Sequence, residues 1–527
     1  MTATTAPEDM KITYTSNTAD METFHKYFDE ALEAIMADMG KDYPMVIGGK
    51  SFESELEPIA NVSPVDHDLA LGSFSAADER HVDMAVSTAK GAFPAWRDTP
   101  WQKRVEILRK AAHLIRKRKF EFAALMSLEV GKSRMESIGD AEESADLIDY
   151  YCKQMEDANG FVTLMDKITP IETNTDVLRP FGVFACIAPF NFPLALPCGM
   201  SSAALVAGNT IVFKPAEDCP WTGYKLTQLY HEAGVPVGAF NFLPGFGDHM
   251  GDWLTSHANV DGVVFTGSKQ VGLHIYNSLS KKWVKPCLME MGGKNAAIVM
   301  ESADLDAAAD GIVRSAWGLQ NQKCSACSRV YVHKSVAEEL TKKILERTEA
   351  IVKGDPSEKD VFFGPVINEQ AFKKWEAAVA LGRKDGELLV GGKRLTGGIF
   401  DKGFYLEPTI VQAPLESRIF FEEFFSPFLA IGEVDSLDEA IRESNKAEYG
   451  LTAGIFSKEK EELDKFFNEM QTGVLYANKR SGATTGAWPG AQPFCGWKGS
   501  GATGKGGCGP YYTAQFMREQ TRCVVEE

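Results

Sequence analysis

The clearest regularity along the chain is a series of short apolar runs separated by stretches with helical spacing. Four runs, at residues 181–188, 210–215, 263–268 and 296–300, have the length and the β-branched or aromatic content of buried strands. An amphipathic stretch such as residues 224–234 lies between consecutive runs. Strands that alternate with helices predict a parallel, doubly wound sheet and therefore an α/β fold.

A second series of the same kind follows residue 324. Residues 329–333 and 428–434 have the pattern of buried strands, and residues 336–353 have the spacing of an amphipathic helix. The chain therefore contains a second α/β unit.

Three segments outside these series also have a predicted structure. Residues 161–171 and 173–180 are typical of a two-stranded excursion, and residues 513–525 can supply one further strand. The N-terminal arm is expected to be partly helical, because its apolar residues recur at helical spacing: Phe24, Phe28, Leu32 and Ile35.

One uncharged stretch, residues 180–213, is long enough to cross a bilayer. Pro189, Pro193 and Pro197 would interrupt any helix that began there, and Asn191 is polar. A buried strand, a turn and a buried helix explain the stretch better, so no membrane partner is expected.

Length, charge and cysteine content narrow the class of protein. A chain of 527 residues predicts two or three domains. The formal net charge of -18 argues against nucleic acid as a partner, because phosphate binding requires a basic surface. The ten cysteines follow no disulfide framework, and residues 1–10 lack a secretory pattern, so a cytoplasmic protein with reduced thiols is expected.

The most distinctive local motif is Cys324-Ser325-Ala326-Cys327. Such a pair can be half of a zinc site, although no second cysteine or histidine pair completes four ligands. It can also be a redox dithiol. In the third interpretation, Cys324 is a nucleophile and Cys327 is a neighbour packed in the wall of the site.

Other blocks add context to this motif. Glu290 begins the run Glu-Met-Gly-Gly-Lys and precedes Cys324 by 34 residues. Further blocks are Ala-Pro-Phe-Asn-Phe-Pro at 188–193, Phe-Lys-Pro-Ala-Glu at 213–217 and Phe-Thr-Gly-Ser at 265–268. In this order and at this spacing, the blocks resemble the aldehyde dehydrogenase superfamily over nearly the whole chain, from about residue 45 onward.

The resemblance implies a catalytic set of three residues. Cys324 would be the covalent nucleophile, whose ordinary pKa of roughly 8.5 requires activation. Asn191 and the backbone N–H of Cys324 would bind the oxyanion, and Glu290 would activate water. Without this context, Asn191 could instead be a turn residue beside a proline, and Glu290 could be an ordinary surface carboxylate. Lys323 either assists electrostatically or is a solvated lysine.

The same resemblance implies NAD as the cofactor. Lys214 and Glu217 end a buried strand, where ribose hydroxyls bind in doubly wound sheets. A carboxylate there repels a 2′-phosphate and so favours NAD over NADP. Gly267 and Ser268 open the next helix, where phosphate binds. The usual glycine fingerprint is absent, and the near match at residues 245–251 is interpreted as a loop.

A later block, Glu-Phe-Phe-Ser-Pro at 423–427, resembles the family element whose Glu and Phe contact the nicotinamide ribose. Glu423 and Phe425 are therefore predicted to bind the cofactor. Ser426 stands where glycine is usual, which predicts a local change in the backbone, and Cys495 likewise replaces a glycine.

Three further blocks are Lys-Cys-Ser-Ala-Cys-Ser-Arg at 323–329, Thr-Gly-Ala at 485–487, and Ser500-Gly501 followed by Lys505, Gly506, Gly507 and Pro510. They resemble one branch of the family, the L-glutamate γ-semialdehyde (1-pyrroline-5-carboxylate) dehydrogenases. That resemblance implies an α-carboxylate site made by Ser325 and the N–H groups of Gly486 and Ala487. The rings of Phe192 and Phe494 would enclose the aliphatic chain of the substrate. The branch has a glutamate near the mouth of the site, and this sequence departs from it with Asp146 at that place.

This sequence departs from the branch at Trp488-Pro489, which replaces two small residues, and in a longer loop between residues 478 and 486. Because the branch resemblance holds outside these departures, oxidation of L-glutamate γ-semialdehyde in proline catabolism is the expected function. Another carboxylated or aliphatic aldehyde is the alternative, and a non-catalytic family member is disfavoured because Cys324, Glu290 and Asn191 are all present.

The expected architecture is that of the family: a Rossmann-type cofactor domain, a second α/β catalytic domain and a β-flap for oligomerisation. The small-molecule aldehyde and a second copy of the chain are the expected partners, and no metal is expected. The predicted boundaries are an N-terminal arm at 1–43, an NAD-binding domain at 44–158 and 180–290, a flap at 159–179 and 496–527, and a catalytic domain at 291–495.

Overall fold

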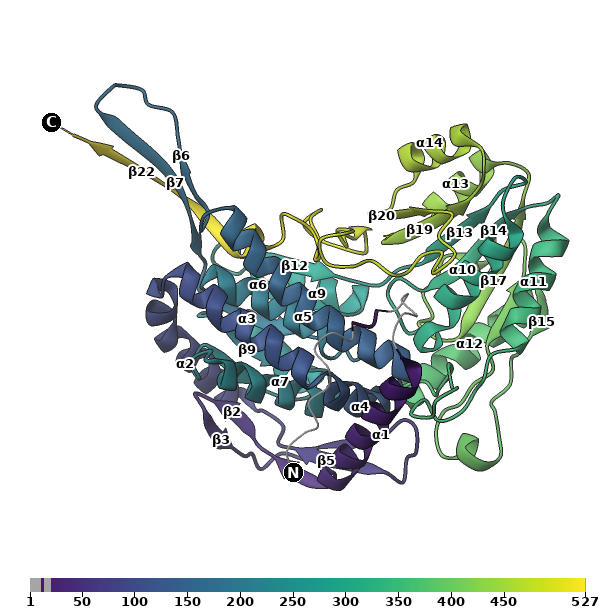
Figure 1. Ribbon diagram of the computed structural model, residues 1–527, viewed down its shortest axis with the longest axis horizontal. Helices are drawn as coiled ribbons and strands as arrows, with labels where there is room; N and C mark the ends of the chain where they lie inside the picture. The colour runs from purple at the N-terminus through teal and green to yellow at the C-terminus, as the bar shows by residue number, and fades with distance from the viewer. Residues whose placement is uncertain (1–10, 14–19, 527) are drawn as a thin grey trace.

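Two seven-stranded sheets organise the chain in a computed structural model that describes residues 11–13 and 20–526. Each sheet forms the centre of one lobe, and a smaller three-stranded sheet projects away from both lobes (Figure 1). Both α/β series expected from the apolar pattern are therefore present. The assignment of the run at 296–300 to the first series is corrected, because this run forms a strand of the second sheet.

The first sheet contains the strands expected between residues 181 and 268. Five of its strands are parallel, and β2 and β3 add an antiparallel edge. Its strands, in spatial order, are β12 (Cys287–Glu290), β11 (Gly262–Thr266), β8 (Val183–Ile187), β9 (Thr210–Lys214), β10 (Phe240–Phe242), β2 (Met45–Ile47) and β3 (Lys50–Phe52).

Helices cover both faces of this sheet, which explains why its strands are apolar throughout. Val183 and Ala185 of β8 pack in a core with α2 (Glu79–Asp98), α8 (Gly247–Ser256) and α9 (Lys269–Leu279). Phe184 and Cys186 pack on the opposite side, in a core with α6 (Ala195–Ala207) and α7 (Pro220–Ala233). The uncharged stretch thus forms β8, a turn, α6 and the start of β9, as predicted. Within the described residues, no helix has the length and apolarity to cross a membrane.

The second sheet repeats this plan with six parallel strands and one antiparallel edge strand. Its helices are α10 (Leu305–Trp317), α11 (Ala337–Glu349), α12 (Glu369–Asp385), α13 (Leu437–Asn445) and α14 (Lys460–Glu469). Its strands, in spatial order, are β15 (Glu387–Val390), β16 (Thr409–Gln412), β17 (Phe428–Val434), β14 (Cys327–His333), β13 (Asn295–Val299), β19 (Thr452–Phe456) and β20 (Val474–Ala477).

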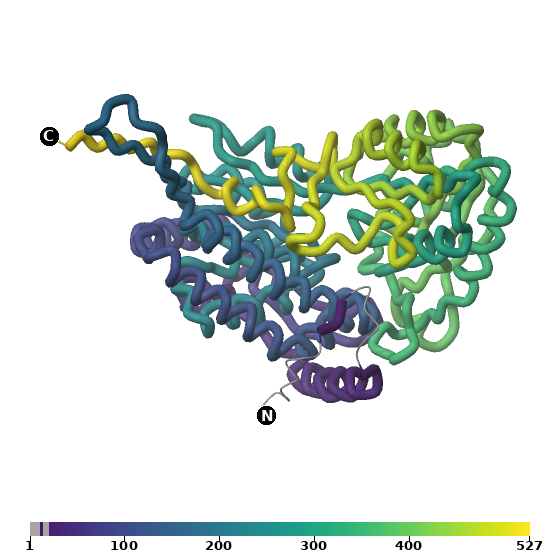
Figure 2. Tube along the Cα trace, turned by 45° about the horizontal axis from the view of Figure 1, so that its top comes forward, coloured from purple at the N-terminus to yellow at the C-terminus, as the bar shows by residue number. Residues whose placement is uncertain are grey.

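The third sheet joins the expected excursion to the C-terminal tail. β7 (Glu172–Pro180) lies between β6 (Val162–Leu164) and β22 (Met517–Val525), and both pairings are antiparallel. Figures 1 and 2 show this sheet as an arm that extends beyond the helices of the first lobe. Apolar side chains are exposed on it, including Leu164 (69%) and Ile168 (89%).

The described part of the N-terminal arm is partly helical, as its apolar spacing predicts. Asp20 caps α1 (Met21–Asp38) by accepting a hydrogen bond from the backbone of Glu22. Phe24, Phe28 and Ile35 are buried, as their spacing predicts. Residues 1–10 and 14–19 of the predicted arm lie outside the described residues.

Helices α3 (Trp101–Lys117), α4 (Lys119–Val130) and α5 (Arg134–Asp157) connect this arm to the first sheet. Helix α1 packs on α4, and α5 packs on both α4 and α6. The remaining strands are β1 (Lys41–Tyr43), β4 (Ile59–Val62), β5 (Ala70–Phe74), β18 (Tyr449–Gly450) and β21 (Trp497–Lys498).

Candidate active site

A cavity of about 120 Å³ brings together residues of β11 and β12 in the first sheet, of α5, α6 and α10, of the loop before β14 and of the C-terminal segment. Cys324 and Glu290 both line it. The two residues that the sequence places 34 positions apart therefore face the same space.

The backbone around Cys324 is fixed by side-chain amides. Asn295 donates from Nδ2 to the carbonyl oxygens of Cys324 (2.7 Å) and Ala326 (2.9 Å). Asn321 donates from Nδ2 to the carbonyl of Cys327 at 2.8 Å. Three consecutive residues just before the motif, Leu319 to Asn321, have positive φ angles. Cys324 thus lies in a tightly specified turn between α10 and β14.

The thiol of Cys324 lies in surroundings that favour its neutral form. Burial raises its pKa, and the nearby carboxyl groups of Glu290 and Glu423 raise it further. The reactive species is the thiolate, so catalysis requires a base or a cation to favour deprotonation.

Glu290 ends β12 and provides a candidate base. Burial raises the pKa of Glu290 well above its usual value. Its Oε1 is enclosed and has no hydrogen-bond partner among the described residues. A carboxyl group with this environment is suited to accept a proton from a water molecule near Cys324.

The two glycines after Glu290 are approached by protein groups. A side chain at Gly292 would collide with the carboxylate of Glu423, and one at Gly293 would collide with the carbonyl of Cys324. Glu423 Oε1 also accepts a hydrogen bond from the N–H of Gly293 at 2.7 Å. Close packing of the protein itself therefore requires glycine at both positions.

Asn191 lies beside the segment that leads to the nucleophile. Its side chain is 3% exposed, and Nδ2 donates to the carbonyl of Gln322 at 3.0 Å. The amide nitrogen has a second hydrogen, so one donor remains for an oxyanion near Cys324.

Lys323 is buried, and the interpretation as a solvated lysine is wrong. Its Nζ lies 2.5 Å from Glu136 Oε2 and 5.9 Å from the ring centroid of Phe192. Burial alone would raise the pKa of Glu136, but Lys323 and other nearby cations hold that pKa below its usual value. The ion pair with Glu136 therefore fixes Lys323, the residue before Cys324, close to the ring of Phe192, a predicted substrate contact.

Cys327 packs in the wall of the site, as the third interpretation of the motif requires. It is buried, and its Sγ contacts the carbonyl of Arg329 at 3.6 Å. In the described part of the chain, no group of three or more His, Cys, Asp or Glu residues could hold a metal ion.

The predicted ribose-binding pair lies at the carboxyl end of β9. Lys214 is 6% exposed, and its Nζ is 3.6 Å from Glu217 Oε1. Glu217 also accepts a hydrogen bond from Gly247, the first residue of α8. Ser268 caps α9 by accepting from the N–H of Val271, and a side chain at Gly267 would collide with the ring of Phe265.

The Glu-Phe-Phe-Ser-Pro element accommodates its unusual serine without strain at that position. Phe425 has the positive φ, of 51°, and its ring packs edge-on against Phe190. Ser426 is fully buried and is not among the non-glycine residues with positive φ. The predicted change in the backbone therefore occurs at Phe425, which was predicted to contact the cofactor, and not at Ser426.

Five of the six predicted substrate residues line the cavity: Ser325, Gly486, Ala487, Phe192 and Phe494. Although Asp146 was predicted to contact the substrate, it does not line the cavity. Its carboxylate accepts hydrogen bonds from Lys11 (2.6 Å), Arg116 (2.8 Å) and the indole of Trp488 (2.8 Å). Glu143, three residues earlier on the same helix, faces the cavity instead.

The comparison with family models decides the class of the chain. The model described as the aldehyde dehydrogenase family matches residues 52–521. This chain belongs to that family.

Individual relatives span almost the whole chain. The 1-pyrroline-5-carboxylate dehydrogenase of Geobacillus sp. (strain WCH70) is 38% identical over 95% of this chain and 96% of its own length. A structure of a Thermus 1-pyrroline-5-carboxylate dehydrogenase with bound NAD is 35% identical. It superposes with a TM-score of 0.92 and covers 99% of this chain and 100% of that one.

Another solved relative is named for a different substrate. A 3,6-anhydro-L-galactose dehydrogenase in complex with NAP is 32% identical, with a TM-score of 0.86. It covers 92% of this chain and 100% of its own. The family and the fold are therefore shared by enzymes that act on different aldehydes.

Sequence reasoning missed several residues of the cavity in this family member. Glu143, Arg314 and Tyr151 line it from helices, and Cys508 and Tyr512 from the C-terminal segment. None belongs to a motif with a chemical spacing. The only usable signal was the helical repeat around Asp146, which could have placed Glu143 one turn earlier on the same face.

Proposed function

We propose that this protein oxidises L-glutamate γ-semialdehyde to L-glutamate with NAD as the hydride acceptor, a step of proline catabolism. The observation that carries the proposal is one cavity that contains Cys324, Glu290 and the Gly486–Ala487 pair. Its relatives named for the same reaction support the substrate.

The residues at the end of β9 fit an adenine ribose. Glu217 is 42% exposed at its side chain, so one carboxylate oxygen remains available beside the bond to Gly247. Lys214 has three N–H donors, of which one bonds the carbonyl of Pro215. A carboxylate and an ammonium together suit the 2′- and 3′-hydroxyls and disfavour a 2′-phosphate. Gly267 and Ser268, at the start of α9, would lie beside the pyrophosphate. Glu423 and Phe425 would hold the nicotinamide ribose.

The first chemical step forms a bond between Cys324 Sγ and the aldehyde carbon. The negative charge on the aldehyde oxygen is stabilised by the Nδ2 donor of Asn191 and by the backbone N–H of Cys324. NAD accepts the hydride that leaves this carbon, and a thioester on Cys324 remains.

Glu290 acts in the second step by removing a proton from water as the water oxygen attacks the thioester. The C–S bond breaks, and Cys324 leaves as a thiolate. The net reaction converts the aldehyde, water and NAD⁺ into a carboxylate, NADH and two protons.

The substrate-binding side of the cavity fits a five-carbon chain with a carboxylate at its far end. Phe192 and Phe494 would enclose the methylene groups, and Ser325 with the N–H groups of Gly486 and Ala487 would bind the α-carboxylate. Trp488 and the longer loop before Gly486 are the features that leave a related aldehyde as the second candidate.

The proposed domain boundaries are those predicted from the sequence, with the flap as an oligomerisation element. Exposed apolar side chains on the flap, among them Ile168 and Ile171, support a second copy of the chain as its partner. All ten cysteines lie in the described part of the chain and none is in a disulfide, which supports a cytoplasmic location.

The proposal is tested by NADH formation across an aldehyde panel: glutamate γ-semialdehyde, succinate semialdehyde, propanal and 3,6-anhydro-L-galactose. The highest kcat/KM is expected for the first. A higher kcat/KM for any other aldehyde would overturn the substrate assignment but leave the reaction class intact.

A further inference from the structure

One ammonium group donates hydrogen bonds to two carbonyl oxygens of the loop that contains Gly486 and Ala487. Lys479 Nζ donates to the carbonyl oxygen of Thr485 at 2.7 Å and to that of Gly486 at 3.1 Å. Two successive carbonyls can point the same way only if the residue between them leaves the extended conformation. Gly486 leaves the extended conformation, because its φ is 93°, a value that residues other than glycine rarely adopt.

The geometry of the peptide bond means that these hydrogen bonds also orient the N–H groups of Gly486 and Ala487. In a planar trans peptide, the carbonyl and the N–H point in opposite directions. The carbonyl of Thr485 shares its peptide with the N–H of Gly486, and the carbonyl of Gly486 shares its peptide with the N–H of Ala487. Because Lys479 holds both carbonyls, both N–H groups point away from it, and both residues line the cavity.

Lys479 also places a positive charge behind these N–H groups. Its ammonium lies 4.1 Å from the ring centroid of Tyr476, and burial lowers the pKa of Lys479 to about 8. Among the described residues, no carboxylate forms an ion pair with it, although buried charges are normally paired. A substrate carboxylate held by the N–H groups would supply that missing negative charge.

We infer that Lys479 is a positioning residue for carboxylated aldehydes: it orients the N–H groups of Gly486 and Ala487 toward the cavity and provides a counter-charge behind them. The inference rests on the proposed function, because it assumes that the carboxylate of the substrate binds at this pair.

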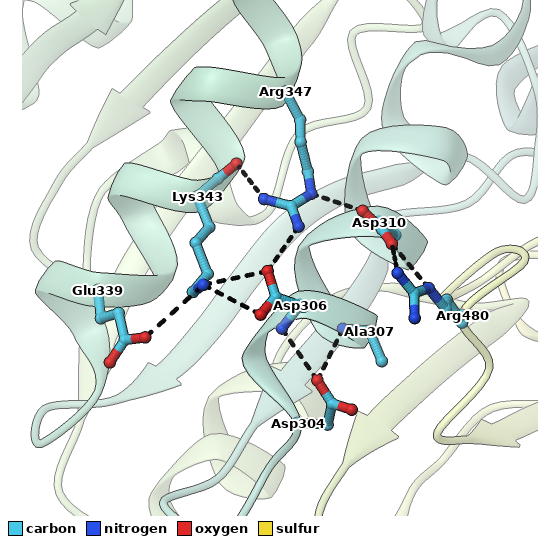
Figure 3. A network of polar contacts seen from close by, with 8 residues as sticks. All are labelled: Asp304, Asp306, Ala307, Asp310, Glu339, Lys343, Arg347 and Arg480. Carbon is cyan, nitrogen blue, oxygen red and sulfur yellow. Dashed lines mark hydrogen bonds and ion pairs between the residues drawn. The ribbon is translucent and has the colours of Figure 1, made fainter.

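The next residue in the chain offers a matched control. Arg480 is 65% exposed at its side chain and pairs with Asp310 of α10 at 2.6 Å. Figure 3 shows Arg480 within a surface network that also contains Asp306 and Arg347. It has the same charge and lies in the same loop, but contacts α10 instead of the carbonyls of Thr485 and Gly486.

The experiment compares Lys479→Met, Lys479→Gln, Lys479→Arg and Arg480→Met with the unaltered enzyme. Each is assayed with glutamate γ-semialdehyde and with propanal, which has no carboxylate. Glutarate, an unreactive dicarboxylate, is titrated as an inhibitor of propanal oxidation, and thermal unfolding is recorded for every variant.

Lys479→Met is expected to raise both the KM for the semialdehyde and the inhibition constant of glutarate roughly tenfold or more. The kcat for the semialdehyde and the propanal constants should stay within about twofold, since Cys324 is untouched. Lys479→Arg should recover most of the loss, and Arg480→Met should leave all constants within about twofold. Lys479→Gln keeps an N–H donor without charge and should give an intermediate value, which preserves the test if the methionine variant does not fold.

Two results would overturn the inference: equal losses on propanal and the semialdehyde, or unchanged glutarate inhibition in both uncharged variants. Failure of the proposed function has a different readout, because the unaltered enzyme would then show no preference for glutamate γ-semialdehyde over propanal.

Discussion

The reacting side and the substrate-anchoring side of the cavity are built by different means. Cys324 and Glu290 lie next to the ends of parallel strands, and backbone and amide hydrogen bonds fix them. Gly486 and Ala487 lie in a loop, which the side chains of Lys479 and Asp146 hold from two directions. If the proposed function holds, the chemistry depends on the sheet, whereas the selectivity depends on a few charged side chains.

This contrast explains how related enzymes share a reaction and differ in substrate. Strand ends move little when surface residues change, because both faces of each sheet are buried. A loop held by individual hydrogen bonds can be rearranged by replacing one partner. Changes on the reacting side should therefore abolish turnover, and changes on the anchoring side should alter KM for particular aldehydes.

The largest effect is expected for Cys324→Ala. Loss of the nucleophile should lower NADH formation by at least about a thousandfold on every aldehyde. Steady-state rates measure the loss, and Cys327→Ala provides the control, which should keep most activity because Cys327 is part of the wall. Loss of activity only in the Cys327 variant would contradict the assignment.

Glu290→Gln should reduce kcat by roughly 10²–10⁴-fold, the usual contribution of a general base. Acyl transfer to water would then limit the rate, so one equivalent of NADH should form in a burst before turnover slows. Rapid-mixing measurements of NADH absorbance, with mass spectrometry of the acylated protein, check this outcome. A uniformly slow reaction without a burst would assign Glu290 to an earlier step.

The pH dependence should be steep on the reacting side. The pKa values of Cys324 and Glu290 are both raised, and both groups act after losing a proton, so activity should fall as pH decreases. Where the thiolate is the minority form, kcat/KM should change by about tenfold for each pH unit. Rates with propanal from pH 6 to 10 measure this slope, and a kcat/KM that falls with increasing pH would contradict it.

A small effect is expected for Asp146→Asn on the anchoring side. Although burial opposes ionisation, hydrogen bonds from Lys11, Arg116 and Trp488 hold the pKa of Asp146 below its usual value. Weakening these bonds should raise KM for glutamate γ-semialdehyde by about threefold while the propanal constants stay unchanged. A larger effect on propanal than on the semialdehyde would show that the loop position does not determine selectivity.

The sequence by itself determined the two parallel sheets, the flap strands and the catalytic candidates. Apolar runs covered on both faces, such as residues 181–188, leave little choice of structure. The Glu290-to-Cys324 spacing and the Asn191 block belong to motifs that are continuous in the chain, so pattern reasoning could find them.

Only the tertiary structure decided which side chains complete the cavity. Glu143 rather than Asp146 faces it, because the rotation of α5 is set by its packing against α3, α4 and α6. Lys323 is paired with Glu136, 187 residues earlier, and Lys479 bonds carbonyls of a loop that no repeat pattern describes. Contacts between distant segments depend on how helices and loops pack, and a linear pattern of apolar and polar residues contains no record of that packing.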